Sequence, residues 1–213
     1  MASKKDLKNK RDSSRLIALG VILLALGLII PITTFLPVVK AEIVYQLRQE
    51  PNLLATPTPI EPVDRDFSII IPKINANTKV MKNVDPYDPG KYQPALTKGV
   101  AHAVTSSLPN EPGNIFIFAH SAGNWYQANQ FNAVFYLLNK LVVGDEIILY
   151  YQDQDYHYMV SETKLVNGSD VSYLKNNSAN QQLTLMTCWP PGTTLKRQIV
   201  IAKLSTSGQP QAF

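Results

Sequence analysis

The feature that most constrains the fold is a series of short β-forming runs between residues 67 and 204, each bounded by turn-forming residues. The runs are rich in Ile, Val, Thr, Tyr and Phe, which strands favour. They occupy residues 68–71, 99–102, 114–120, 146–151, 156–166, 171–174, 183–188 and 198–204. Residues such as Pro72 and Pro112-Gly113 separate them, because proline lacks a ladder N–H and glycine favours turns.

Helical signals are few in this region. Phe131, Val134, Phe135 and Leu138 recur at the spacing of one helix face, which predicts a short amphipathic helix. Residues 82–98 are predicted to form a loop, because Asp-Pro and Pro-Gly pairs fall there. About eight short strands with one or two short helices are typical of a closed barrel. We therefore expect a mainly β fold, closed as an antiparallel or mixed barrel.

The N-terminal region has a different composition. Residues 1–15 are polar and basic, and residues 16–39 are almost entirely apolar. As a helix, residues 16–39 would extend about 36 Å, enough for a bilayer core of roughly 30 Å. The basic flank comes first, so the positive-inside rule places it in the cytoplasm and the domain outside the membrane. The alternative is a cleaved signal peptide, which would also export the domain.

Charge and composition then divide the chain. The predicted parts are a cytoplasmic basic tail (1–15), a single transmembrane anchor (16–39), a Pro-rich extracytoplasmic linker (40–66), a folded domain (67–206) and a polar tail (207–213). The formal net charge of +4 arises wholly within residues 1–15, because the basic and acidic side chains of the remainder balance. A nucleic-acid partner is therefore not expected.

The most informative stretch for chemistry runs from residue 183 to residue 197. Cys188 is the only cysteine of the chain and lies where a buried strand would end, because Trp189-Pro190-Pro191-Gly192 cannot continue it. Arg197 follows as the next strand begins. A thiol at a strand end beside a guanidinium suits a cysteine nucleophile, which needs a cation where an oxyanion develops. The alternative for a lone cysteine is a small buried apolar residue.

One cysteine excludes an intrachain disulfide. Three histidines and one cysteine form no metal-ligand spacing, so a structural zinc is not expected. No cofactor is predicted, and the sequence does not decide whether calcium is required.

Several motifs resemble those of the sortases, membrane-anchored cysteine transpeptidases of bacterial surfaces. Thr-Leu-Met-Thr-Cys at 184–188, followed by Arg197, resembles the sortase signature Thr-Leu-x-Thr-Cys…Arg. Ile-Pro-Lys-Ile at 71–74 is similar to the opening of sortase domains. Gly99-Val100, Pro112-Gly113-Asn114 and Ala119-His120-Ser121 resemble the stretch that ends in the sortase histidine, although the family usually has Gly in place of Ala119. The resemblance implies an eight-stranded sortase-like barrel over residues 67–204.

The resemblance assigns catalytic roles to His120, Cys188 and Arg197. Cys188 would attack a peptide carbonyl, His120 would transfer protons, and Arg197 would stabilise the oxyanion. Strand alternation predicts that Lys196 points away from the thiol. His102 is interpreted as a structural residue or a support of the site, and His157 as a surface residue.

The implied function is cleavage of a C-terminal LPxTG-like sorting signal on secreted proteins through a thioacyl intermediate. The acyl group would pass to an amine of the cell wall or to a pilin lysine, and the enzyme would be a single-pass protein of the bacterial cell membrane. Two alternatives remain. One is a membrane-tethered cysteine peptidase that uses water, although papain-like peptidases place Cys before His, in contrast to His120 and Cys188. The other is a non-catalytic barrel that binds peptide or wall polymer.

Overall fold

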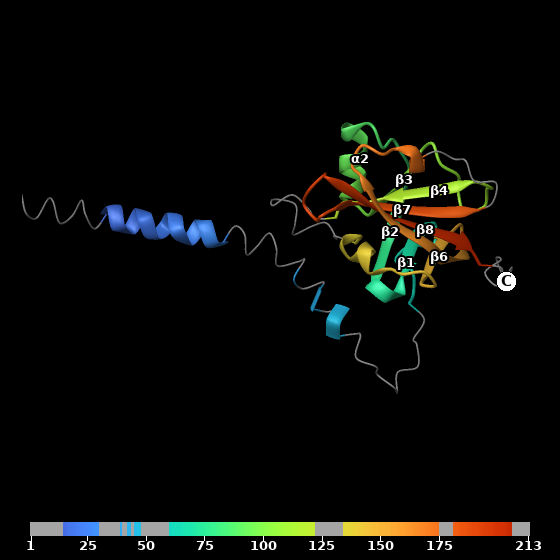
Figure 1. Ribbon diagram of the computed structural model, residues 1–213, viewed down its shortest axis with the longest axis horizontal. Coiled ribbons are helices and arrows are strands. Elements are labelled where there is room, and N and C mark those ends of the chain that lie inside the picture. The colour runs from blue at the N-terminus through green and yellow to red at the C-terminus, as the bar shows by residue number, and fades with distance from the viewer. Residues whose placement is uncertain are drawn as a thin grey trace, which may run out of the picture.

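The structure is a computed structural model that describes residues 15–29, 39, 42–43, 45–47, 60–121, 134–174 and 181–205. Its strands are β1 (Phe67–Ile71), β2 (Ala76–Val84), β3 (Val100–Ala103), β4 (Asn114–Phe118), β5 (Glu146–Tyr151), β6 (Gln154–Asn167), β7 (Gln182–Trp189) and β8 (Lys196–Leu204). These eight strands close into one barrel in the order β1-β2-β3-β4-β7-β8-β6-β5 (Figure 1). The predicted mainly β barrel is confirmed.

The barrel is mixed because two of its strand pairs are parallel. β2 pairs with β3 in parallel, and β4 pairs with β7 in parallel. The other neighbours are antiparallel. Because β4 and β7 run in the same direction, the residues that follow them emerge at the same edge of the sheet.

The core explains why these segments form strands. Every residue of β1 and of β4 is buried, and both strands are made almost entirely of Ile and Phe, which pack well on a pleated surface. Burial of one such side chain contributes about 1.5–3 kcal/mol before conformational entropy is counted. The core cluster joins strands from all around the barrel, so the sheet edge that carries the site rests on a closely packed scaffold.

The loop predicted for residues 82–98 is wrong in part. β2 continues to Val84, and α2 (Pro89–Leu96) follows. The Asp88 side chain accepts a hydrogen bond from the Gly90 N–H at 2.9 Å, and Pro89 occupies the start of the helix. Asp-Pro-Gly was interpreted as a turn, but Asp at the N-cap followed by Pro is also a helix-start pattern.

Within the described part of the amphipathic helix predicted around Phe131–Leu138, the structure has a short turn of 3₁₀ helix. The element η2 covers Tyr136–Lys140, and Phe135 and Leu138 are fully buried as the spacing predicted. Phe131 lies outside the described residues. Two other 3₁₀ turns, η1 (Pro72–Ile74) and η3 (Ser172–Leu174), follow β1 and β6.

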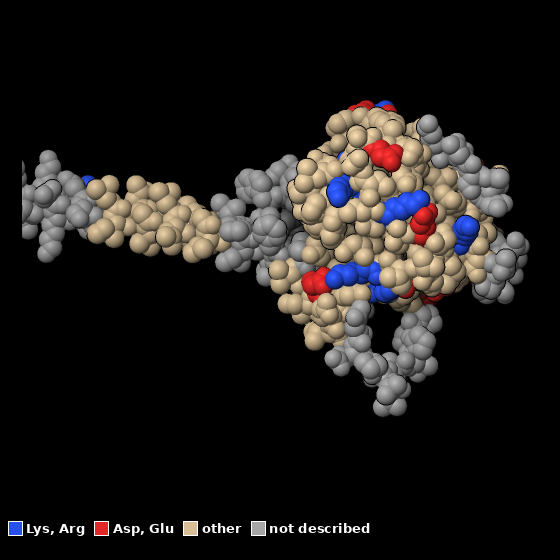
Figure 2. Space-filling view, viewed as in Figure 1, with Lys and Arg blue, Asp and Glu red and all other residues tan. Residues whose placement is uncertain are grey.

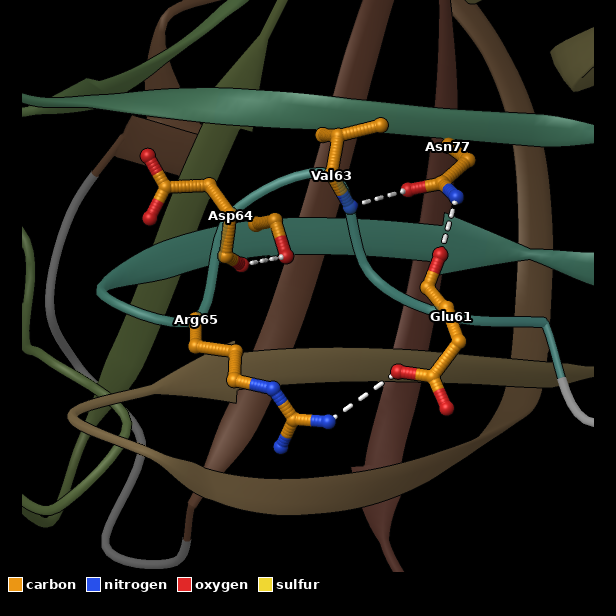
Figure 3. Close-up of polar contacts among 6 residues, drawn as sticks. Glu61, Val63, Asp64, Arg65 and Asn77 are labelled. Atoms are coloured by element: carbon orange, nitrogen blue, oxygen red, sulfur yellow. Dashed lines mark hydrogen bonds and ion pairs between the residues drawn. The ribbon is translucent and has the colours of Figure 1, made fainter.

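The chain enters the barrel through a hydrogen-bonded approach segment. The Asn77 side-chain amide on β2 donates to the Glu61 carbonyl at 2.7 Å, and its oxygen accepts from the Val63 N–H at 3.2 Å (Figure 3). Arg65 pairs with Glu61 at 3.0 Å. Within the region assigned to the linker, residues 61–65 are therefore held against the strands.

An earlier part of the same region also contacts the barrel. The Tyr45 side chain is only 8% exposed and belongs to the core cluster. Lys140 of η2 pairs with Glu42 at 2.9 Å and lies 5.4 Å from the Tyr45 ring centre. These contacts bring the described part of residues 42–47 onto η2.

Residues 15–29 are helical, and their large apolar side chains are exposed. In the part of the chain that the structure describes, none of the helices combines the length and the apolar character needed to cross a membrane. The predicted transmembrane helix over 16–39 is therefore not supported there, and residues 30–38 lie outside the described ranges.

The surface of the barrel carries mixed charge. On the face shown in Figure 2, Lys and Arg side chains lie among Asp and Glu side chains, and no large area of one sign is visible among the residues described. This distribution agrees with the balanced composition of the chain beyond residue 15.

Candidate active site

Cys188 and Arg197 face each other across the antiparallel pair β7 and β8. Their Cα positions are direct partners in the ladder, and Arg197 Nη1 lies 3.4 Å from Cys188 Sγ. Both side chains are half-buried. The residues between the two strands, 190–195, form the β7–β8 loop. The sequence prediction of a thiol at a strand end beside a guanidinium describes this geometry.

His120 reaches the same place from β4. The parallel ladder pairs Phe118 with Met186 and continues one step further, because the Ala119 N–H donates to the Met186 carbonyl at 3.1 Å. Extending this register sets His120 opposite Cys188. Neighbouring strands lie about 4.8 Å apart, so His120, Cys188 and Arg197 form a row across three adjacent strand ends.

The three side chains also share one face of the sheet. Successive side chains of a strand point to opposite faces. On β7, Leu183 and Leu185 belong to the core cluster, which places Cys188 on the outer face. Arg197 is the direct partner of Cys188, and His120 has the matching position on the extended β4 register. The row therefore lies on the outer face of β7 and β8.

A buried threonine links the chain segments that carry His120 and Cys188. Thr187 Oγ1 donates to the Ala119 carbonyl at 3.0 Å, and the side chain of Thr187 is 2% exposed. The bond joins the residue before Cys188 to the residue before His120. Sequence reasoning quoted Thr187 as part of a motif without giving it this role.

Ser121 is a second site residue that sequence reasoning missed. It is buried, and its Oγ accepts a hydrogen bond from the Gly192 N–H at 3.4 Å. The bond links the segment after His120 to the β7–β8 loop. Its only sequence signal was its position next to the histidine.

Burial shapes the chemistry of His120. Desolvation lowers the pKa of its half-buried imidazole. The neutral ring is therefore favoured near pH 7 relative to a free histidine, which suits a group that must accept a proton from an amine.

The other two histidines lie elsewhere. His102 on β3 pairs with Ile117 on β4. Its side chain therefore points to the opposite face of the sheet from that of His120. It is fully buried, accepts from the Asn83 N–H at 3.3 Å through Nδ1, and donates from Nε2 to the Ser107 carbonyl at 2.9 Å. Burial lowers its pKa. These contacts give His102 a structural role inside the barrel.

His157 lies on β6 and is partly exposed. Its Nδ1 is 2.7 Å from Glu146 and its Nε2 is 3.1 Å from Asp155. Lys196 pairs with Trp189 in the ladder and is exposed, so it points away from the thiol as strand alternation predicted. Among the described residues, no group of three or more His, Cys, Asp and Glu side chains could hold a metal ion.

The arrangement places a thiol, an imidazole and a guanidinium at one rim of a closed mixed barrel, and these groups can serve as nucleophile, proton carrier and cation. This combination defines a site for cysteine-based acyl transfer.

Comparison with known proteins agrees with that class. The sequence profile of the Sortase domain matches residues 69–205. Sortase D of Bacillus subtilis (strain 168) is 30% identical over 139 residues, which are 64% of this chain and 62% of that protein. The chain thus spans less than two thirds of that relative.

Solved structures show the same relationship. A sortase D5 transpeptidase of Clostridium perfringens matches with a TM-score of 0.53 and 27% identity, covering 77% of this chain and 88% of that one. A lid mutant of sortase A from Corynebacterium diphtheriae matches with a TM-score of 0.55 and 26% identity, covering 70% and 74% of the two chains. The chain belongs to the sortase family, whose members are cysteine transpeptidases.

Proposed function

We propose that this chain is a transpeptidase that cleaves a C-terminal LPxTG-like sorting signal and transfers the acyl fragment to an amine. The observation that carries the proposal is the contact of 3.4 Å between Arg197 Nη1 and Cys188 Sγ, in a row that the β4 register extends to His120. A barrel that only binds peptide has no need of these three groups in one row.

In the first half of the reaction, His120 takes the proton of the Cys188 thiol, and the resulting thiolate attacks the carbonyl carbon of the Thr-like residue. The carbonyl π electrons move onto oxygen, and Arg197 stabilises that oxyanion by donating hydrogen bonds. When the carbon–nitrogen bond breaks, His120 gives a proton to the leaving amine. The product is a thioester between Cys188 and the acyl fragment.

In the second half, an incoming amine attacks the thioester carbonyl. His120, now neutral, takes the proton of the attacking nitrogen, and Arg197 again stabilises the oxyanion. The carbon–sulfur bond breaks, an amide forms and the thiolate is restored. The amine belongs to a cell-wall peptide or to a pilin lysine.

The membrane is part of the same proposal. Residues 1–15 are basic and residues 16–39 are apolar, and residues 15–29 are helical. We propose a single-pass anchor with the barrel outside the cell. The protein should then remain in the membrane fraction after alkaline carbonate washing, and a soluble form beginning near Glu42 would contradict the anchor.

The test of the activity is a sorting-signal peptide library incubated with the protein, with and without an added amine, and analysed by mass. Transpeptidation predicts an amide product whose mass includes the amine. A product carrying only the mass of water, unchanged by added amine, would instead indicate the membrane-tethered peptidase.

A further inference from the structure

Arg197 can stabilise an oxyanion at Cys188 only if its guanidinium is held in place. Arg197 Nη1 donates to the Thr194 carbonyl at 3.2 Å and to the Lys196 carbonyl at 3.3 Å, and the same atom lies 3.4 Å from Cys188 Sγ. The position of the Thr194 carbonyl therefore helps to fix the distance between the guanidinium and the thiol.

The chain that leaves β6 lies against the Thr194 carbonyl and is hydrogen-bonded to the next carbonyl, that of Leu195. β6 pairs with β8 as far as Asn167 opposite Lys196. One residue later, the Gly168 N–H donates to the Leu195 carbonyl at 3.1 Å. Gly168 thus continues the ladder past the end of the strand and lies against the β7–β8 loop.

The contact at Gly168 leaves no space for a side chain. A Cβ at this position would lie 2.3 Å from the Thr194 carbonyl oxygen and 3.1 Å from the Leu195 carbonyl oxygen. Among the glycines that the structure describes, Gly113, Gly144 and Gly192 have a positive φ, and Gly168 does not belong to this set. Glycine is therefore needed here for close approach, and alanine would displace the carbonyl that orients Arg197.

We propose that Gly168 is a positioning residue for the transpeptidation, acting through the Thr194 carbonyl on the guanidinium of Arg197. The inference rests on the proposed roles of Cys188 and Arg197. It adds the residue that directly follows β6, a strand that carries no proposed site residue. Displacing a catalytic group by about 1 Å can cost up to about 10²-fold in rate.

The first test compares Gly168→Ala with Gly99→Ala. Gly99 is a matched control, because a Cβ there would lie 2.2 Å from the Lys79 carbonyl oxygen on β2, and β3, β4 and β7 separate β2 from β8. We expect Gly168→Ala to lower kcat by about 10-fold to 10²-fold with a smaller change in KM. Gly99→Ala should lower the melting temperature and leave the kcat of the folded protein near wild type.

The second test is a double-mutant cycle with Arg197→Ala. If Gly168 acts through Arg197, adding Gly168→Ala to Arg197→Ala should cause little further loss of kcat/KM. Losses that multiply would overturn the proposal, and so would a folded Gly168→Ala protein with wild-type kcat. Activity of Cys188→Ala would instead overturn the proposed function itself.

A milder pair of variants covers the case in which Gly168→Ala does not fold. The Thr194 side chain is exposed, so Thr194→Ala serves as the reference variant, which removes the side chain without adding the backbone freedom of glycine. Thr194→Gly retains the carbonyl but loosens its backbone, and it should lower kcat several-fold only while Arg197 is present. Equal kcat for the two Thr194 variants would contradict the proposal.

Discussion

At the scale of single residues, the guanidinium of Arg197 is the group whose chemistry is hardest to replace. Its Nη1 contacts the thiol and two backbone carbonyls at once, and a guanidinium carries further N–H donors in the same plane, which can hold an oxyanion. Lysine carries the same charge as a point on a flexible stem. Exchange of Arg197 for Lys would therefore keep the positive charge but lose the fixed geometry of the hydrogen bonds.

We therefore expect Arg197→Lys to lower kcat/KM on a sorting-signal peptide by about 10²-fold or more, as when an oxyanion donor is removed. Lys196→Ala is the matched control, since Lys196 pairs with Trp189 and is exposed, and it should change kcat/KM little. Circular dichroism checks folding of both variants. Near-full activity of Arg197→Lys with loss in Lys196→Ala would contradict the register of β8.

His157 gives a prediction about pH. Burial lowers the pKa of His157, but hydrogen bonds to Glu146 and Asp155 and their negative charges outweigh it, and the pKa is raised overall. The folded state thus favours the protonated ring. Its stabilisation is full below the unfolded pKa of about 6.5 and is lost as the pH rises through the raised pKa.

The measurement is the free energy of unfolding of the wild type minus that of His157→Gln, from urea denaturation between pH 5.5 and pH 9. The difference should be about 0.2–1 kcal/mol at the acidic end, as for partly exposed ion pairs. It should shrink toward the alkaline end. A difference that grows with pH would show that the ring is not stabilised by the two carboxylates.

At the scale of elements, the site depends on the alignment of β4, β7 and β8. The Thr187 hydroxyl is the side-chain link across the parallel pair, because it donates to the Ala119 carbonyl at 3.0 Å from a buried position. A buried carbonyl that loses its donor is costly, by about 1–3 kcal/mol. This hydrogen bond keeps the residue before His120 in register with the residue before Cys188.

We expect Thr187→Val, which keeps the shape but removes the donor, to lower the free energy of unfolding by about 1–3 kcal/mol and to reduce kcat. Thr187→Ser keeps the hydroxyl and should retain more of both. Chemical denaturation and peptide turnover give the two readings. Equal behaviour of the Val and Ser variants would show that the hydroxyl does not align the strands.

Most elements were predictable from local pattern, and the exceptions have physical causes. Residues 146–151 were predicted as a strand and form β5 with the same bounds. This run is rich in β-branched and aromatic residues, and a turn follows it directly. α2 was missed because Asp88-Pro89-Gly90 serves a turn and a helix start equally well. A local pattern does not tell which strands pair, so the parallel pairing of β4 with β7 was not predicted.

The same reasoning applies within the site. The proximity of Cys188 and Arg197 could be predicted from the sequence, because only the β7–β8 loop separates the ends of their strands. The contact of Gly168 with the Thr194 carbonyl could not be predicted from the sequence, because it depends on the pairing of β6 with β8. The roles of Thr187 and Ser121 likewise depend on which strand lies beside them.

At the scale of the whole molecule, the barrel is joined to the chain that precedes it. Tyr45 is buried in the core cluster beside Lys140, whereas Leu47 is 70% exposed. Tyr45→Ala should lower the free energy of unfolding by about 1.5–3 kcal/mol, and Leu47→Ala should change it little. Urea denaturation measures both. Equal stability of the two variants would show that residues 42–47 do not rest on η2.

In the proposed mechanism, Cys188 holds the acyl fragment as a thioester after the first amide bond breaks and before the second one forms. The most direct measurement is intact-protein mass spectrometry after mixing the protein with a sorting-signal peptide in the absence of an amine. We expect an adduct of the acyl fragment on Cys188, released by hydroxylamine and absent from Cys188→Ala. Turnover of the peptide by Cys188→Ala, or an adduct on another residue, would contradict it.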